Sequence, residues 1–314
     1  MPLSRLILTA LLGPSVFILA TMSALAAVLA QLGRFRPGFD ILTHFAPFYL
    51  VGGFAAVALG LLFHGLFRRL TLAAGLAAAL AAVLLMAHEL LLSAGPQAGA
   101  GPTLKIVQLN VWQGEGGLTR AVDWLVSESP DVAVVEEADH RVRDAVVART
   151  GWHVTGGRND VMIFSRAAPL ATLVPETDTV GPMNLVGVRL PTPLGPAAIL
   201  GVHYPWPISS ERAPATKVLT GIIKGLPRGS TILAGDFNST PWSFERRRDD
   251  RDFGLIRRTR ALFSWPARVL WPFLVLPIDH LYAGPAWATV AVRRGPDIGS
   301  DHYPVIVTLG PAQR

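Results

Sequence analysis

Two features are scarce in this sequence: cysteine throughout and charge in the first third. None of the 314 residues is cysteine, which excludes disulfides, thiolate metal sites and cysteine nucleophiles. Among residues 1–100, the charged side chains are Arg5, Arg34, Arg36, Arg68, Arg69, Asp40 and Glu89. The net charge of +6 is therefore shared equally by residues 1–100 and 101–314. Neither part is basic enough for its charge alone to indicate nucleic-acid binding.

Residues 1–92 are predicted to form a membrane domain. They contain three apolar runs, Leu6–Leu32, Leu42–Phe67 and Leu70–Leu92. Each run is close to or longer than the ~20 residues that cross a ~30 Å hydrocarbon core. Three such runs in succession, nearly free of charge, favour transmembrane helices over the buried helices of a soluble core. The first run is too long for a signal peptide and lacks a cleavage context.

The few arginines of this domain predict its orientation. Arg5, Arg68 and Arg69 flank the predicted spans on one side, and Arg34 and Arg36 flank them on the other. Because positive charge is enriched on the cytoplasmic side of membrane proteins, this distribution favours a cytoplasmic N-terminus. Three spans then place the rest of the chain outside the cytoplasm.

A soluble α/β domain is predicted after a linker. Residues 93–102, with the sequence SAGPQAGAGP, are rich in Gly and Pro and uncharged, which is typical of a linker. In residues 103–314, short apolar runs bounded by turn residues predict strands, and three stretches between them have a helical pattern. The predicted strands are Leu104–Leu109, Val132–Val135, Val161–Phe164, Leu185–Leu190, Ala197–Val202, Thr231–Ala234, Ile278–Tyr282 and Val305–Leu309, and the predicted helices are Leu118–Ser127, Arg141–Arg149 and Glu211–Lys224, the last with Ser210 as its cap. This order indicates a mixed sheet or two packed sheets.

Polar side chains stand at one end of six of these strands. They are Asn110, the pair Glu136 and Glu137, His203, Asp236 with Asn238, Asp279, and Asp301 with His302. Each has an ordinary alternative explanation, such as an Asx turn at Asp236. Six together, on strands that share a core, are better explained by one polar cleft at the edges of the sheets.

The residue types in this cleft predict its chemistry. Several carboxylates without cysteine favour a hard divalent cation, Mg²⁺ or Mn²⁺, bound through oxygen. Histidines beside aspartates can contact a phosphoryl oxygen or move protons. The sequence has no nucleophile elbow, no Gly-rich phosphate loop and no close pair of zinc-binding histidines. The cleft therefore predicts metal-assisted attack of water on a phosphate ester.

The motifs in residues 103–309 resemble the endonuclease/exonuclease/phosphatase superfamily. They are QLNVW (Gln108–Trp112), VVEEAD (Val134–Asp139), MIFSRAAPL (Met162–Leu170), GVHYP (Gly201–Pro205), AGDFNSTPW (Ala234–Trp242), PIDHLYAG (Pro277–Gly284) and GSDHYPVIVTL (Gly299–Leu309). The resemblance implies a four-layered α/β sandwich of two mixed β-sheets flanked by helices. With the three spans ahead of it, the chain is similar to a bacterial membrane-bound branch of the family. We therefore expect a multi-pass protein of the bacterial inner membrane with an extracytoplasmic catalytic domain.

The resemblance also implies which residues hold the metal and the phosphate. Glu137 would be the main metal ligand, Asn110 would support metal and phosphate, and Asp301 would lie in or just behind the metal shell. Asn238 and His302 would contact the phosphate. The adjacent Glu136 would face the other way, because neighbouring strand residues point to opposite sides.

The same resemblance implies four catalytic roles. Asp236 would orient or deprotonate the attacking water, and Asn238 would hold the nucleophile or a phosphoryl oxygen. Asp279 would pair with His302. His203 would protonate the leaving group.

The substrate remains open at this stage, since substrates of the family range from DNA to phospholipid headgroups. Residues 244–260 contain seven arginines and four acidic residues, and Trp265, Trp271 and Phe273 follow them. They form either a solvated helix with a packed loop or a basic, aromatic surface for anionic lipid headgroups or a phosphate-rich polymer. Three functions follow: a membrane-anchored phosphodiesterase or phosphomonoesterase, a nuclease acting on extracytoplasmic DNA or RNA, and a non-catalytic binding protein on the same fold. The complete polar set argues against the third.

Overall fold

The computed structural model describes residues 3–93, 95–114, 117–156, 160–174, 183–267 and 276–313. The chain divides into two compact units. The first consists of Met1–Leu92 together with Trp242–Arg247, and the second of Ser93–Pro241 and Arg248–Arg314. Trp271 and Phe273, which the sequence places in a possible aromatic surface, lie outside the described residues.

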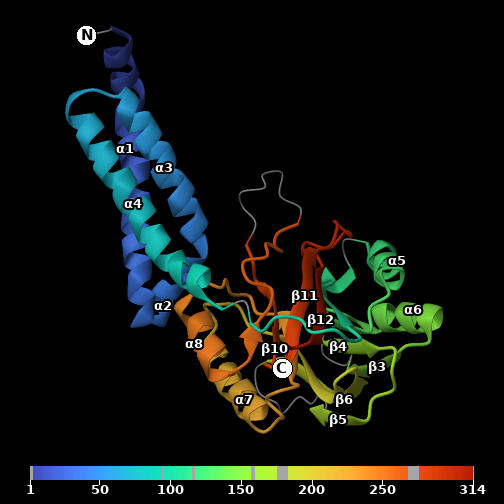
Figure 1. Cartoon of the computed structure of the whole chain (residues 1–314). Coiled ribbons are helices and arrows are strands. Elements are labelled where there is room, and N and C mark those ends of the chain that lie inside the picture. Colours follow the sequence, from blue (N-terminus) through green and yellow to red (C-terminus); the bar gives the residue numbers. More distant parts are fainter. Residues whose placement is uncertain are drawn as a thin grey trace. The chain divides into compact units, whose positions relative to one another are not determined.

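The first unit is built on three long helices, α1 (Leu3–Ala30), α3 (Ala46–Leu62) and α4 (Gly65–Leu91) (Figure 1). Short helices join α1 to α3: η1 (Gln31–Arg34), α2 (Pro37–Asp40) and η2 (Ile41–Phe45). Three segments, Leu3–Arg34, Pro37–Leu62 and Gly65–Leu91, are long and apolar enough to cross a membrane. Glycine lets α3 and α4 pack closely, because a Cβ on Gly53 would lie 2.7 Å from the carbonyl oxygen of Gly75.

The break between the second and third long helices comes earlier than the sequence predicts. It falls at Phe63 and His64, where the backbone is extended. Arg68 and Arg69, which the hydropathy pattern places between two spans, therefore lie near the start of α4. Both arginines still lie near the N-terminal end of the third predicted span, which is the position that the predicted orientation requires.

Residues Trp242–Arg247 belong to the same unit as the long helices. The buried Asp40 carboxylate accepts the backbone N–H groups of Phe244 at 2.8 Å and Glu245 at 2.9 Å. Both groups lie in the first turn of α8 (Phe244–Asp252), where backbone N–H groups have no acceptor within the helix itself. The guanidinium of Arg247 lies 4.5 Å from the centre of the Phe244 ring and donates to the Trp242 carbonyl at 3.0 Å. Asp40 therefore caps a helix 204 residues further along the chain.

The arginine-rich stretch is partly buried rather than an open basic surface. Arg246, Arg257 and Arg258 are among the buried residues. Arg257 forms a 3.0 Å ion pair with Asp250, and Arg258 donates to the backbone carbonyls of Gly284 and Trp287. Buried guanidinium groups need such partners to offset their desolvation. These arginines are therefore buried and make contacts that stabilise the fold.

The second unit contains two six-stranded mixed sheets packed face to face. One has the order β11-β12-β1-β2-β4-β3 and the other β5-β6-β7-β8-β10-β9. The strands of the first sheet are β1 (Leu104–Asn110), β2 (Val132–Glu136), β3 (His153–Gly156), β4 (Met162–Ser165), β11 (Trp287–Arg294) and β12 (Val305–Pro311). Those of the second are β5 (Ala171–Val174), β6 (Asn184–Thr192), β7 (Gly195–His203), β8 (Ile232–Asp236), β9 (Ile256–Arg257) and β10 (Asp279–Ala283).

Alternating apolar side chains form the layers of this sandwich. Ile106, Val134, Ile199 and Ile232 belong to a buried cluster between the sheets. On the outer face of the first sheet, side chains of α5 (Leu118–Glu128) and α6 (His140–Thr150) pack against β1, β2 and β4. On the outer face of the second, α7 (Arg212–Lys224) packs against β7 and β8. The four-layered sandwich predicted from the sequence is confirmed.

Several details differ from the sequence prediction. Four strands, β3, β5, β9 and β11, were not predicted, and β5 and β11 are largely exposed. Such strands show little of the apolar run by which buried strands are recognised. Ser210 does not cap α7, since Glu211 occupies the N-cap position without a side-chain hydrogen bond. The linker also has partners, because the Gly99 N–H donates to the Pro311 carbonyl at 2.8 Å.

Candidate active site

Strand pairing brings the predicted polar residues to one edge of the sandwich. In the parallel pair β1 and β2, Asn110 lies opposite Glu136. In the parallel pair β7 and β8, His203 lies opposite Asp236, which is also opposite Asp279 on β10. Parallel strands end at the same edge of their sheet, so short polar side chains at these positions meet.

The Asp-x-Asn sequence after β8 forms a tight turn. The Asp236 Oδ1 atom accepts the Asn238 backbone N–H at 2.7 Å, as in an Asx turn. Asn238 has a left-handed backbone conformation with φ of 49°, which asparagine tolerates better than most residues. Its side-chain amide donates to the Tyr204 carbonyl at 2.9 Å and lies 3.4 Å from His203 Nε2. The turn therefore directs an acid and an amide toward the same imidazole.

Asn110 connects two carboxylates from different strands. Its Nδ2 atom donates to Glu137 Oε1 at 3.0 Å and lies 3.3 Å from Asp236 Oδ2. Glu137 follows the last residue of β2 and has a φ of 51°. This left-handed residue ends the strand and directs Glu137 into the cleft, whereas Glu136 is fully buried.

A buried relay lies behind His302. His302 Nδ1 is 2.9 Å from Asp279 Oδ2, and the other Asp279 oxygen accepts a 2.7 Å hydrogen bond from Gln108 Nε2. Gln108 Nε2 also donates to Glu136 Oε2 at 2.9 Å. Burial, followed by the charges of Asp279 and Asp236, raises the pKa of Glu136 well above its usual range.

His203 has a carboxylate partner that was missed in the sequence. Its Nδ1 atom lies 2.5 Å from Asp160 Oδ2, which also accepts a 2.8 Å hydrogen bond from the Asn184 side chain. Asp160 has an unusual φ of 137°, a conformation that costs energy and often marks functional sites. A signal existed, since Asp160 directly precedes the predicted strand Val161–Phe164 just as the other site residues flank theirs.

Both imidazoles are poised to be cationic. Burial alone would lower the pKa of His203, but the hydrogen bond that its imidazole donates to Asp160 and the charges of the nearby carboxylates raise it to about 9. For His302, the charges of Asp279 and Asp236 likewise outweigh burial and raise the pKa to about 9. Burial and the charge of Asp279 raise the pKa of Asp236 to about 6. Asp236 Oδ2 lies 3.7 Å from Nε2 of each histidine.

Among the residues that the structure describes, one group of side chains could hold a metal ion. Ligand atoms of Asp236, Asp279 and His302 all lie within 4.8 Å of one another. Beside them, Asp301 Oδ2 accepts the Trp265 indole N–H at 3.0 Å, and Asp301 Oδ1 is buried without a hydrogen-bond partner. Carboxylate oxygens with one imidazole suit a hard divalent cation. This group differs from the metal ligands that the family resemblance implies, which are Asn110, Glu137 and Asp301. The two sets are adjacent, because the side-chain amide of Asn110 contacts both Glu137 and Asp236.

These residues border a cleft of about 380 Å³. Its lining includes the site residues Glu137, His203, Asp236, Asn238, Asp301 and His302, together with Trp112, Asn184, Tyr204, Pro205, Trp206, Glu211 and Trp265. Asn110 and Asp279 are fully buried and lie beneath the surface. The cleft can therefore present carboxylate, amide and imidazole groups to one small anion and its metal.

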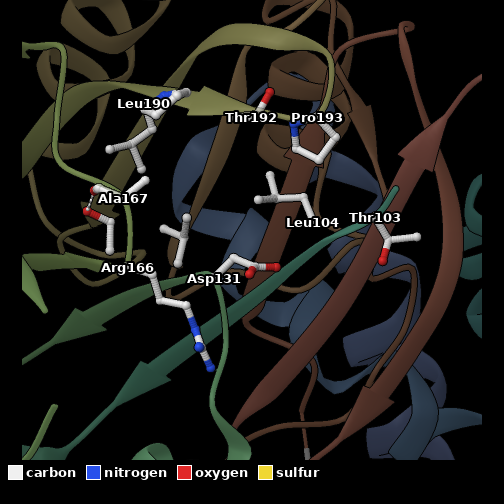
Figure 2. A pocket seen from close by; sticks show the side chains of 11 residues that line it. Thr103, Leu104, Asp131, Arg166, Ala167, Leu190, Thr192 and Pro193 are labelled. Carbon is white, nitrogen blue, oxygen red and sulfur yellow. Dashed lines mark hydrogen bonds between the residues drawn. The ribbon is translucent and has the colours of Figure 1, made fainter. Parts of the chain in front are cut away.

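A second cavity, of about 330 Å³, lies at the opposite end of the strands. Thr103 and Leu104, at the start of β1, and Val132, at the start of β2, contribute to its lining, with Arg166 and Thr192 nearby (Figure 2). The guanidinium of Arg166 donates to the carbonyls of Pro130 and Ser129. This cavity contains none of the predicted site residues.

The sandwich with its acidic, histidine-containing cleft has the architecture of phosphoester-cleaving enzymes, and comparison with known proteins identifies the family. Residues 107–302 match the model of the Endonuclease/Exonuclease/phosphatase family, so the chain belongs to that family. No curated protein is detectably similar in sequence.

Solved structures share the fold. An endonuclease/exonuclease/phosphatase from Beutenbergia cavernae is 19% identical with a TM-score of 0.51, over 67% of this chain and 72% of the other. The 3′ phosphatase NExo from Neisseria, bound to a product DNA hairpin, is 23% identical with a TM-score of 0.54, over 65% and 98%. An AP endonuclease from Archaeoglobus fulgidus is 20% identical with a TM-score of 0.53, over 65% and 98%.

Proposed function

We propose that the chain is a membrane-anchored phosphoesterase that uses a divalent metal ion, Mg²⁺ or Mn²⁺, to hydrolyse a phosphodiester or phosphomonoester with water. The observation that carries this proposal is the convergence of Asp236, Asp279 and His302 within 4.8 Å, in a cleft bordered by Glu137 and His203. Family membership supports it, because this family generally cleaves phosphoester bonds. Three helices long and apolar enough to span a bilayer support the anchor.

The residues of the cleft suit distinct tasks in such a reaction. A divalent ion bound there would neutralise phosphate charge and make water easier to deprotonate. Asp236 and Asp279 are placed to hold it, with Glu137, Asn110 and Asp301 as further candidates, whereas His302, with its raised pKa, would face the phosphate as a cation. The carboxylate and amide oxygens of these side chains are hard ligands, which fits Mg²⁺ or Mn²⁺.

His203 and Asp236 are suited to transfer protons, and His302 is suited to supply positive charge. His203, kept protonated by Asp160, is suited to donate a proton to the departing oxygen. Asp236 is suited to orient the attacking water, and Asn238 to hold a phosphoryl oxygen. His302, oriented by Asp279, supplies positive charge to the phosphate.

The test uses the full chain in detergent and two chromogenic esters, bis(p-nitrophenyl) phosphate and p-nitrophenyl phosphate. Hydrolysis of at least one is expected with Mg²⁺ or Mn²⁺ and is lost with chelator. Glu137→Gln should lower kcat by at least about 100-fold, because it removes a charge beside the metal. Glu211→Gln is the matched control, since Glu211 lines the same cleft but is exposed and outside the predicted ligand set. Full activity in chelator would contradict the metal mechanism.

Measuring Mn²⁺ binding alongside turnover separates an enzyme from a non-catalytic binding protein. The proposal requires both metal binding and turnover, whereas a binding protein on this fold would show the first without the second. Electron paramagnetic resonance of the full chain titrated with Mn²⁺ measures binding independently of activity. Normal Mn²⁺ binding without hydrolysis of any phosphoester offered would favour the binding protein.

A further inference from the structure

Three tryptophans surround the cleft. Trp112 follows β1, Trp206 follows β7, and Trp265 lies between β9 and β10; all three line the cavity. Trp206 and Trp265 meet edge to face with their ring centres 6.3 Å apart. The indole N–H of Trp265 donates a hydrogen bond to Asp301, and the centre of the Trp265 ring lies 6.4 Å from that of His302. An aromatic wall therefore stands directly beside the catalytic groups.

Part of this wall is exposed to solvent. The exposed fraction of Trp206 is 61%, and that of Ile208, two residues further along the same loop, is 79%. Both side chains are large and apolar, and neighbouring exposed apolar residues of this kind often mark a binding surface. An apolar group lying against them would remove their surface from water, which is favourable.

The charge of the cleft opposes a polyanion. None of the described residues that line it is lysine or arginine, while Glu211 adds a carboxylate at its border. Binding of nucleic acid depends on Lys and Arg contacts to phosphates on either side of the one that reacts. A bound divalent ion could neutralise one phosphate group, but it would leave the neighbouring phosphates of a polymer facing carboxylates.

We propose that the preferred substrate is an amphiphilic phosphoester, with one phosphate group and an apolar chain or ring that lies against Trp206, Trp265 and Ile208. The inference rests on the proposed hydrolase function and names its substrate class. In the reaction, the oxygen of water forms a bond to phosphorus while the P–O bond to the leaving alcohol breaks. The alcohol departs with one proton from His203, and a water proton passes to Asp236.

The test is a series of p-nitrophenyl alkyl phosphates, from methyl to octyl, which share a leaving group and charge and differ in apolar length. The full chain is assayed in one detergent at fixed concentration with Mg²⁺ or Mn²⁺. We expect kcat/KM to rise at least tenfold from the methyl to the octyl ester. In Trp206→Ser and Ile208→Ser this octyl-to-methyl ratio should fall at least fivefold, and comparison within one detergent cancels substrate partitioning into micelles.

Leu170→Ser is the matched control. Leu170 has an exposed fraction of 56%, similar to that of Trp206, but it precedes β5 and does not line the cleft. This variant should keep both the ratio and the activity of the unaltered chain. A general loss from altered surface polarity would affect Leu170→Ser as well.

Three results would overturn the inference. Hydrolysis of all esters at equal kcat/KM would refute the apolar subsite and leave the phosphoesterase function standing. Faster hydrolysis of a ten-nucleotide single-stranded DNA than of the octyl ester, with a steep salt dependence, would identify a nuclease instead. Failure to hydrolyse any ester or the DNA with either metal would refute the proposed function together with the inference.

Discussion

Asp160→Asn isolates the charge of the carboxylate that contacts His203. Asparagine has nearly the same shape, and its carbonyl oxygen can still accept a hydrogen bond from His203 Nδ1, which lies 2.5 Å from the Asp160 oxygen. The substitution therefore removes charge with little change in geometry. It should lower the pKa of His203, which Asp160 and other carboxylates hold at about 9.

The size of the effect follows from the protonated fraction of His203. With a pKa of about 9, roughly 90% of the imidazole is protonated at pH 8, whereas an ordinary histidine with a pKa of about 6.5 is only about 3% protonated. If His203 donates the leaving-group proton, kcat at pH 8 should fall by up to about 30-fold. At pH 6 the loss should stay below about twofold, because His203 is then mostly protonated in both the unaltered protein and the variant. The remaining carboxylates, Asp236 and Glu137, make 30-fold an upper limit.

The assay is kcat against pH for both proteins at one saturating Mg²⁺ concentration, so that the metal affects both profiles alike. The alkaline limb of the profile should move to lower pH in Asp160→Asn, and the chemical shift of His203 should titrate at lower pH. Asp131→Asn, which alters a loop carboxylate that accepts the Lys105 N–H, should leave the profile unchanged. An equal loss at pH 6 and pH 8 would refute the reasoning and show that Asp160 only maintains structure.

Three further expectations follow from the remaining contacts. Gln108→Leu should lower kcat about tenfold with little change in KM, because Asp279 loses the hydrogen bond that orients it; Thr231→Val, equally buried but outside the cleft, should not. Asp40→Ala should destabilise the full chain by about 1–2 kcal/mol in thermal unfolding, as a lost helix cap does, whereas the exposed control Asp144→Ala should have little effect. Alkaline phosphatase fused after Arg314 should be active and a reporter that fluoresces only in the cytoplasm should be dark, and the reverse would refute the proposed orientation.

The apolar runs of the central strands were sufficient to predict an α/β domain with a mixed sheet or two packed sheets, and the family resemblance implied the four-layered sandwich. Strands such as β7 and β8 are buried along most of their length, so their composition alone indicates their conformation. The outer strand β11 is buried only at its start and ends in two arginines. Edge strands of this kind owe their conformation to pairing with a neighbour, which is a tertiary effect.

The candidate site could be predicted only where its residues flank such strands. Asn110, Glu137, His203, Asp236 and His302 meet that condition, and the structure brings them to one edge. The contact between Gln108 and Asp279 could not be predicted in this way, because the two residues are 171 positions apart and lie on different sheets that face each other. A local pattern in the sequence does not indicate which buried side chains of one sheet contact those of the other sheet.

Asp40 shows the same limit in the first unit. In the sequence it is an isolated acid between two apolar runs, consistent with a loop at the membrane surface. Its function as a cap for Phe244 and Glu245 depends on how a distant segment packs. Sequence reasoning identifies local caps from adjacent residues, so a cap supplied by another part of the chain was not predictable.

The balance of charge in the cleft explains why a metal ion is central to the proposal. Several carboxyl groups, among them those of Glu137, Asp160, Asp236, Asp279 and Asp301, lie in or beneath the cleft or pair with its histidines. Two imidazoles with pKa values of about 9 offset only part of this negative charge. A phosphate would therefore meet net repulsion, and a divalent cation is the species that reverses it. A cleft of this composition that failed to bind Mn²⁺ would be unsuited to phosphate as substrate or as ligand, so metal binding tests the enzyme and the binding-protein hypotheses together.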